Sequence, residues 1–117
     1  MPIATGFSDP TSLTIHFGEH GQDFSATDEA DYLAQAKAFL EVPLTATGTT
    51  VEGVRAVSGE IVRYDSATEA FAVVKADGTI KTFYKPTPRH LAPTGTPKKK
   101  MHRFATNYDY FLDTCTK

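Results

Sequence analysis

Cysteine is almost absent from this chain of 117 residues, where Cys115 stands alone near the C-terminus. A lone cysteine can form neither an internal disulfide nor a cysteine metal cluster. No apolar run is long enough to cross a bilayer. The first residues lack the basic region and apolar core of a secretory signal. The sequence therefore predicts no membrane anchor and one domain over residues 1–117.

Acidic residues are missing from one part of the chain. Residues 81–103 contain seven Lys or Arg and no Asp or Glu, whereas residues 1–80 contain four Lys or Arg and twelve acids. The total charge of −2 is therefore the sum of an acidic N-terminal part and a basic segment that follows it. The basic part could follow a phosphodiester backbone, or it could be a solvated loop whose lysines aid solubility.

Two helices are expected in the first part of the chain. Asp9 and Pro10 suit a helix start, and Gly21 suits its end. A second helix, capped by Thr27 and stopped by Pro43, carries an apolar stripe that we expect to be core. The stripe consists of Tyr32, Leu33, Ala36, Phe39 and Leu40.

Short strands are expected after the helices, with Asp77-Gly78 as a hairpin turn. Residues 86–103 are predicted to form a basic Pro/Lys-rich loop, and residues 104–112 a final strand or a short helix docked on the sheet. The pattern predicts an α+β domain with N-terminal helices packed on an antiparallel sheet of about four to five strands. The apolar stripe would cover one face of the sheet, and the other face would be free. The expected strands are 51–57, 60–64, 70–75 and 79–85.

The strand at 79–85 carries groups that phosphate esters favour. Strict alternation would turn Ile80, Thr82 and Tyr84 to one face and Lys81, Phe83 and Lys85 to the other. Thr82 and the two lysines could then meet one phosphate only if the strand twists or bulges.

The segment His16–His20 reads H-x-x-E-H. Two histidines one helical turn apart, with Glu19, could hold a zinc ion and activate its water. One histidine could instead be a general acid or base, because an ordinary histidine pKa near 6.5 suits proton transfer around neutrality. The alternative is structural, with His16 packed at the core edge and His20 at the helix end.

Positions from Leu13 to Phe111 form an ordered set: a histidine-rich helix end, a Tyr-Leu helix and a Thr-Phe-Tyr-Lys-Pro strand. The set comprises Leu13-x-x-His16-Phe17-x-x-His20-Gly21-x-x-Phe24, Asp31-Tyr32-Leu33-x-x-Ala36-x-x-Phe39, Val62-x-Tyr64-Asp65, Phe71-x-Val73-Val74, Asp77-Gly78-x-Ile80-x-Thr82-Phe83-Tyr84-Lys85-Pro86 and Tyr110-Phe111. With it the chain resembles the colicin D-like toxins of the barnase/EndoU/colicin/RelE (BECR) ribonuclease group.

The resemblance implies a BECR-type fold and a metal-independent endoribonuclease, without a cofactor, that cuts tRNA in or near the anticodon loop. It also implies a toxin domain from the C-terminal part of a secreted or surface protein, as in contact-dependent inhibition or polymorphic toxins, acting in the target-cell cytoplasm. The expected partners are tRNA and a cognate immunity protein with an acidic surface. The expected state is a monomer or a 1:1 toxin–immunity complex.

The resemblance also suggests roles for residues. The family's helix-end histidine falls on His20, and its strand hydroxyl falls on Thr82. Glu19 stands where the family commonly has a lysine, so cations from elsewhere would contact the phosphate. The expected catalytic set is His20, Thr82, Lys85, His16 and Arg63. The expected RNA-binding set is Lys81, Tyr84, Lys98, Lys99, Lys100, Arg103 and Tyr110.

The expected chemistry is attack by the RNA's own 2′-hydroxyl, which leaves a 2′,3′-cyclic phosphate. His20 would transfer a proton, Thr82 would donate a hydrogen bond to a non-bridging oxygen, and Lys81 or Lys85 would offset developing charge. Tyr84 and Tyr110 would stack on a splayed base. The alternatives are a non-catalytic RNA- or protein-binding module and a zinc hydrolase that uses His16, Glu19 and His20.

Overall fold

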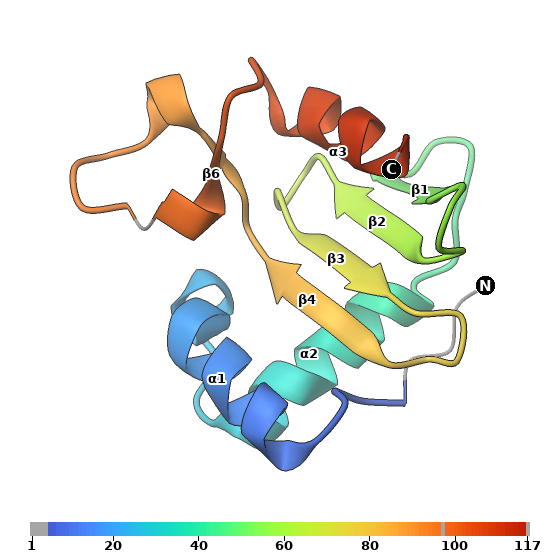
Figure 1. The fold of residues 1–117 in the computed structure, drawn as a ribbon, viewed down its shortest axis with the longest axis vertical. Coiled ribbons are helices and arrows are strands. Elements are labelled where there is room, and N and C mark those ends of the chain that lie inside the picture. Colours follow the sequence, from blue (N-terminus) through green and yellow to red (C-terminus); the bar gives the residue numbers. More distant parts are fainter. Residues whose placement is uncertain (1–4, 97, 117) are drawn as a thin grey trace.

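The computed structural model describes residues 5–96 and 98–116, without the side chain of Lys99. Within them the chain is an α+β fold, as predicted: a four-stranded antiparallel sheet in the order β1-β2-β3-β4 with helices on both faces (Figure 1). The elements are α1 (Pro10–His20), α2 (Glu29–Glu41), β1 (Thr50–Val54), β2 (Ile61–Asp65), β3 (Phe71–Val74), β4 (Ile80–Tyr84) and α3 (Asn107–Cys115). None of the helices in these ranges has the length and apolarity needed to cross a membrane.

The helix ends follow the sequence signals with two differences. Asp9 caps α1 by accepting a hydrogen bond from the Ser12 backbone N–H at 2.7 Å. The cap of α2 is Asp28, not Thr27, because the Asp28 carboxylate accepts from the backbone N–H three residues on, at 2.8 Å. Gly21 ends α1 as predicted, but in a right-handed conformation that continues into a 3-10 turn. A Cβ there would lie 2.8 Å from the Phe17 ring, so close packing requires the glycine.

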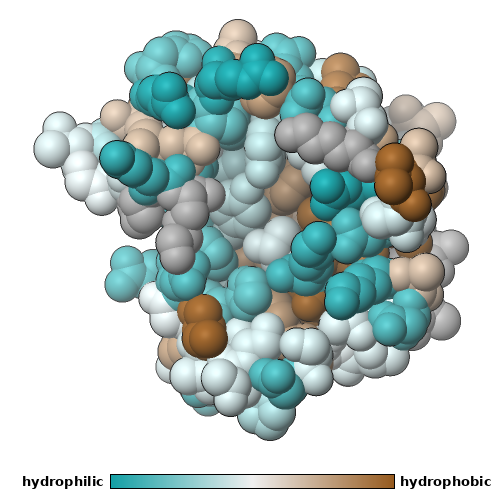
Figure 2. Space-filling view, viewed as in Figure 1, coloured by the Kyte–Doolittle hydropathy of each residue, from teal (hydrophilic) through white to brown (hydrophobic). Residues whose placement is uncertain are grey.

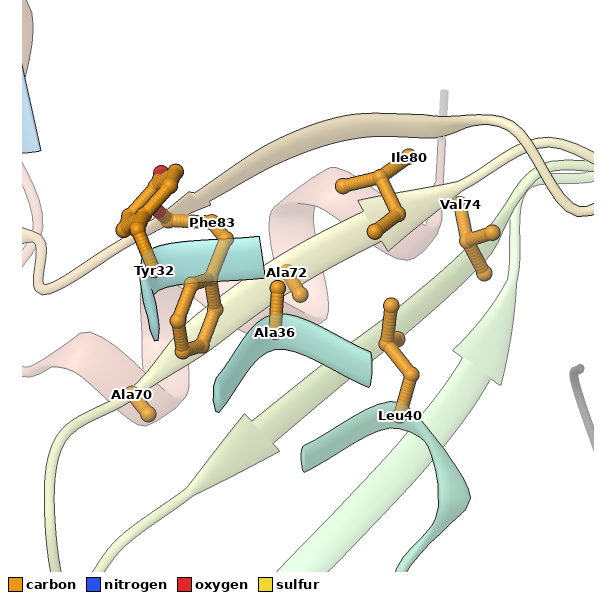
Figure 3. Close-up of a cluster of buried hydrophobic side chains, with 8 residues drawn as sticks. All are labelled: Tyr32, Ala36, Leu40, Ala70, Ala72, Val74, Ile80 and Phe83. Carbon is orange, nitrogen blue, oxygen red and sulfur yellow. The ribbon is translucent and has the colours of Figure 1, made fainter. Parts of the chain in front are cut away.

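The apolar stripe of α2 is core, as predicted. Tyr32, Ala36 and Leu40 are fully buried against one face of the sheet (Figure 3). The Tyr32 hydroxyl donates to the backbone carbonyl of Phe83, which ties α2 to β4. The sheet contributes Ala70, Ala72, Val74, Ile80 and Phe83 to this core.

The other face of the sheet is covered in part by α3, so the expectation of a free face is wrong. Residues 107–115 form the docked helix, the second of the two predicted possibilities, and Phe111 is 4% exposed on a cluster from β2, β3 and β4. Apolar side chains on this sheet face would otherwise lie in water. The helix approaches β1 closely at Gly53, where a Cβ would lie 2.4 Å from Cys115 Sγ.

A bulge interrupts β4 and corrects the predicted alternation. Val73 pairs with Thr82, whereas Val74 pairs with Ile80, so one extra residue is inserted in β4. Ile80 and Phe83 consequently share the α2 face, and Tyr84 lies on the α3 face. The predicted grouping of Ile80 with Tyr84 is therefore wrong.

The basic segment is more structured than the loop predicted over residues 86–103. Its β5 (Thr87–Pro88) and β6 (Met101–His102) pair in parallel as a small second sheet. Two short 3-10 turns, Arg89–Leu91 and Lys98–Lys100, lie between these strands. The pairing brings His102 and the start of α3 beside the end of β4 (Figure 1).

Candidate functional site

The α3 face of the sheet is hollowed where α3 leaves β3 and β4 uncovered. Figure 2 shows this face, with hydrophilic side chains bordering the hollow. Here a cavity of about 320 Å³ combines cations and hydroxyls with an apolar floor. We call it the β4 cavity, and its lining residues are Arg55, Phe71, Val73, Lys81, Thr82, Tyr84, Tyr110 and Thr114.

The β4 bulge explains why Lys81 and Thr82 line one cavity although they are consecutive in the strand. In a regular strand their side chains would point to opposite faces. Thr82 and Lys81 can therefore face the same phosphate, which strict alternation would have prevented. Lys85 does not line this cavity.

Two cations share one carboxylate at the edge of the β4 cavity. Glu60 Oε2 lies 3.1 Å from Lys81 Nζ, and Glu60 Oε1 lies 2.9 Å from Arg55 Nη1. Burial of Glu60 disfavours its charged form and alone would raise the pKa of this carboxyl. The pKa is nevertheless lowered, because hydrogen bonds from Lys81 and Ser58 and the positive charges of Lys81 and Arg55 outweigh burial. Arg55 Nε is buried without a hydrogen-bond partner among the described residues.

Two phenols meet at the floor of the cavity. The hydroxyls of Tyr84 and Tyr110 lie 2.7 Å apart. Burial is the main cause that raises the pKa of Tyr84 far above neutrality, and the neighbouring Tyr110 is the second cause. The Tyr84 hydroxyl therefore stays protonated and can donate a hydrogen bond. The rings do not form the expected stacking platforms. Tyr84 is 7% exposed, and the Tyr110 ring lies flat on His102 at 4.5 Å.

His20 reaches this group from the end of α1. Its ring centre lies 5.1 Å from that of Tyr84, and its Nε2 lies 3.7 Å from Glu19 Oε2. The residue is only 5% exposed, and Nδ1 has no hydrogen-bond partner among the described residues. Burial lowers the pKa of His20 despite the opposing charges of Glu19 and Asp23. The imidazole is therefore neutral at neutral pH and able to accept a proton.

A lysine reaches the neighbourhood of His20 from the basic segment. Lys100 Nζ pairs with the Asp23 carboxylate, three residues after His20. Burial has the largest lowering effect on the pKa of His20. The charges of His16 and then of Lys100 lower it further. Lys100 thus brings to the histidine the positive charge that the local sequence, with Glu19, lacks.

Arg63 was expected in the catalytic set, but it lies in the core and does not line the β4 cavity. The side chain is fully buried on the α2 face of the sheet. Nε donates to Glu52 at 2.7 Å, and Nη1 donates to the carbonyls of Phe39 and Val42 at 3.1 and 2.6 Å. These carbonyls lie at the C-terminal end of α2, where a cation is favourable. Arg63 therefore acts as a buried clamp between α2 and the sheet.

His16 and Lys85 also lie away from the β4 cavity. His16 Nδ1 is 2.9 Å from the Ser12 carbonyl, and its ring centre is 6.1 Å from that of His20. Lys85 Nζ lies 5.5 Å from the centre of the Phe24 ring. In the part of the chain that the structure describes, no three His, Cys, Asp or Glu side chains are placed to hold a metal. The zinc-hydrolase alternative therefore finds no ligand set there.

The remaining expected RNA contacts lie on the basic segment. Lys98 and Arg103 are exposed, and the Arg103 guanidinium lies 4.4 Å from the Phe104 ring centre. The side chain of Lys99 lies outside the description. Neither Lys98 nor Arg103 lines the β4 cavity.

Sequence reasoning missed Arg55 and His102. Arg55 directly follows β1 and lines the β4 cavity, and its only signal in the sequence was a cation five residues before Glu60. His102 is 7% exposed, and both ring nitrogens are occupied: Nε2 by Asn107 Oδ1 at 2.7 Å and Nδ1 by the Phe104 backbone N–H at 3.2 Å. A histidine held on both sides supports the fold, whereas Nδ1 of His20 has no hydrogen-bond partner within residues 5–96 and 98–116.

Comparisons with known proteins give a likeness in structure. No family model matches the chain, and no curated protein matches it by sequence. A similar solved structure is a ribonuclease from Escherichia coli complexed with its inhibitor protein. The match has a TM-score of 0.49 and 19% sequence identity, and it covers 64% of this chain and 83% of that chain.

Proposed function

We propose that this protein is a metal-independent endoribonuclease of the toxin type that cleaves tRNA, in or near the anticodon loop, at the β4 cavity. The observation that carries the proposal is a cavity lined by cations and a hydroxyl, with a histidine that does not line it but contacts one of its lining residues, Tyr84. Lys81 and Arg55 supply positive charge, Thr82 supplies a hydroxyl, and neutral His20 lies against Tyr84. Cleavage by the RNA's own 2′-hydroxyl needs such charge and proton transfer, and no metal.

In this mechanism a neutral His20 removes the proton of the 2′-hydroxyl. The oxygen attacks the neighbouring phosphorus and the bond to the 5′-oxygen breaks. The protonated His20 then gives up its proton and the leaving 5′-oxygen gains one, directly or through water, so the products are a 2′,3′-cyclic phosphate and a free 5′-hydroxyl. Thr82 and one hydroxyl of the Tyr84–Tyr110 pair donate hydrogen bonds to the non-bridging oxygens, and Lys81 balances the added negative charge. Since His20 is 5% exposed, the bound RNA must displace the side chains that cover its ring.

The biological setting rests on the family resemblance. We propose that the chain is the C-terminal toxin part of a secreted or surface protein, that it acts in the cytoplasm of the target cell, and that a cognate immunity protein neutralises it as a 1:1 complex. Charge complementarity favours an acidic inhibitor surface over the basic segment. Replacing Lys98, Lys99 and Lys100 together by glutamate should weaken inhibitor binding strongly. Unchanged affinity would contradict this part of the proposal.

The deciding experiment is incubation with total bacterial tRNA, with and without excess EDTA. Wild type should give discrete fragments that end in 2′,3′-cyclic phosphates and persist in EDTA. His20→Ala should lose cleavage, while His90→Ala, which alters an exposed histidine of the basic segment, should retain it. Circular dichroism should confirm that each variant is folded. Cleavage that EDTA abolishes, or that His20→Ala retains, would refute the mechanism.

The burial of His20 favours a second candidate function, an RNA- or protein-binding module without chemistry. In that case tRNA would bind in a salt-dependent manner and remain intact. His20→Ala would then leave tRNA affinity unchanged. The same cleavage assay, run beside a tRNA-binding titration, separates the two functions.

A further inference from the structure

A second and larger cavity is lined by the residues that follow β4, beginning with Lys85. Its volume is about 520 Å³, within the range of about 300–1,000 Å³ typical of small-molecule sites. It is open to solvent and is lined by the β2–β3 turn, the segment after β4 and the start of α3. We call it the Glu69 cavity, and its main lining residues are Glu69, Lys85, Pro86, Leu91, Thr106 and Tyr108.

Glu69 is held rigidly at the wall of this cavity by one carboxylate oxygen. Oε2 accepts hydrogen bonds from the Tyr64 hydroxyl at 2.7 Å and from Asn107 Nδ2 at 2.5 Å. Oε1 accepts none among the described residues. The backbone of Glu69 has φ of +66°, a left-handed conformation that costs energy for a residue with a side chain. A strained, oriented carboxylate with one open oxygen is suited to binding a ligand that donates hydrogen bonds.

Tyr108 provides a flat apolar surface at the same cavity. Its side chain is 47% exposed, and its ring is supported from behind by Phe111, with 6.1 Å between ring centres and 27° between planes. This is the kind of surface that Tyr84 and Tyr110 do not offer, since their rings are covered. Exposed aromatic rings stack on unpaired bases in RNA complexes.

We infer that the Glu69 cavity binds a guanine base of the RNA, stacked on Tyr108 with its N1–H and exocyclic amine directed at the Glu69 carboxylate. A carboxylate accepts hydrogen bonds and donates none. Guanine presents two adjacent N–H donors on one edge, whereas adenine presents a donor beside an acceptor there. Lys85 lines this cavity and the preceding residue, Tyr84, lines the β4 cavity, so the two cavities follow one another along the end of β4 and one RNA chain is proposed to occupy both. The inference rests on the proposed ribonuclease function and adds its base preference.

The test first measures the binding of nucleotides, which requires no cleavage. Guanosine 3′-monophosphate, inosine 3′-monophosphate and adenosine 3′-monophosphate are titrated into the full chain by calorimetry. Inosine differs from guanosine only by the missing amine, which removes one hydrogen bond to a charged group. Wild type should therefore bind the guanosine nucleotide about tenfold or more tightly than the inosine nucleotide.

Glu69→Gln is the decisive variant because it keeps size and shape. Its amide oxygen must take the place of Oε2, which accepts two hydrogen bonds, so its NH2 group is turned toward the cavity. A donor would then face the donors of guanine, and the preference over inosine should vanish. Tyr108→Ala should weaken all three nucleotides by a similar factor. Glu41→Gln, at the exposed end of α2, is the matched control and should leave the ratios unchanged.

The outcomes separate this inference from the ribonuclease proposal. Equal affinity of wild type for guanosine and inosine nucleotides, or a preference that survives in Glu69→Gln, would overturn the guanine site. Failure to bind any of the three would overturn it as well. Selective guanosine binding by a protein that leaves tRNA intact would support the site and refute the nuclease. Cleavage products with no guanine at the cut would refute the site and leave the nuclease standing.

Discussion

Replacement of Arg63 by alanine tests whether this residue supports the fold or the chemistry. The side chain is fully buried and joins Glu52 of β1 to the last carbonyls of α2. If the structural reading is right, Arg63→Ala should destabilise the protein severely, since it removes three hydrogen bonds and leaves their partners behind.

The size of the effect follows from these contacts. Removing one partner of a buried ion pair costs about 3–5 kcal/mol. The Glu52 side chain is 19% exposed, so water can partly solvate the freed carboxylate and the lower value applies. Two helix-end carbonyls that lose their donor add about 1 kcal/mol in total or slightly more. The sum of about 4 kcal/mol is a large share of the roughly 5–15 kcal/mol expected for the whole domain. The melting temperature should fall by about 15 °C.

Urea unfolding followed by circular dichroism measures this cost. Arg89→Ala, in an exposed 3-10 turn, is the matched control and should change the free energy of unfolding by less than about 0.5 kcal/mol. A loss below about 1 kcal/mol in Arg63→Ala would refute the clamp. If that small loss accompanied a loss of RNA cleavage, Arg63 would have to be returned to the catalytic set.

Three further predictions concern packing, pH and charge. Gly53→Ala should cost about 1–3 kcal/mol by clashing with Cys115 Sγ, and the double variant with Cys115→Ala should recover most of it in urea unfolding. Since burial lowers the pKa of His20, the unfolded chain binds more protons than the folded chain below about pH 6.5. Stability should therefore fall as pH drops through this range, and His20→Ala should flatten the dependence. Glu60→Gln should free two cations, so tRNA affinity should rise at low salt and the slope of log affinity against log salt should steepen by about one to two.

Local patterns predicted the elements of the fold well. The stripe from Tyr32 to Leu40, the Asp9 cap and the Asp77-Gly78 turn each specify their structure through a few neighbouring residues, and the helices, strands and α+β class follow. Thr82 and Lys81 were also expected at a site, and they line one cavity. Their chemical roles remain predictions.

Features that depend on contacts between residues distant in sequence could not be predicted in this way. A bulge in β4 has no clear signature in Ile80–Tyr84, because it depends on how the strand meets β3. From sequence alone, Arg63 could be a catalytic cation. In the fold, the end of α2, more than twenty residues away in sequence, lies beside it and accepts its hydrogen bonds. The exposed ring of Tyr108 and the covered rings of Tyr84 and Tyr110 differ only in their neighbours, which sequence spacing does not give.

The parallel pairing of β5 with β6 also affects how this protein can change during evolution. The two strands hold the ends of the segment between them side by side, so its length is uncoupled from the four-stranded sheet and from both cores. Doubling the length of such a closed loop costs only about 0.6 kcal/mol in chain entropy. Insertions there can alter surface charge without disturbing β4 or α3. We therefore expect variation in substrate or inhibitor choice to accumulate between Thr87 and His102, while the strand that carries Thr82 stays constrained.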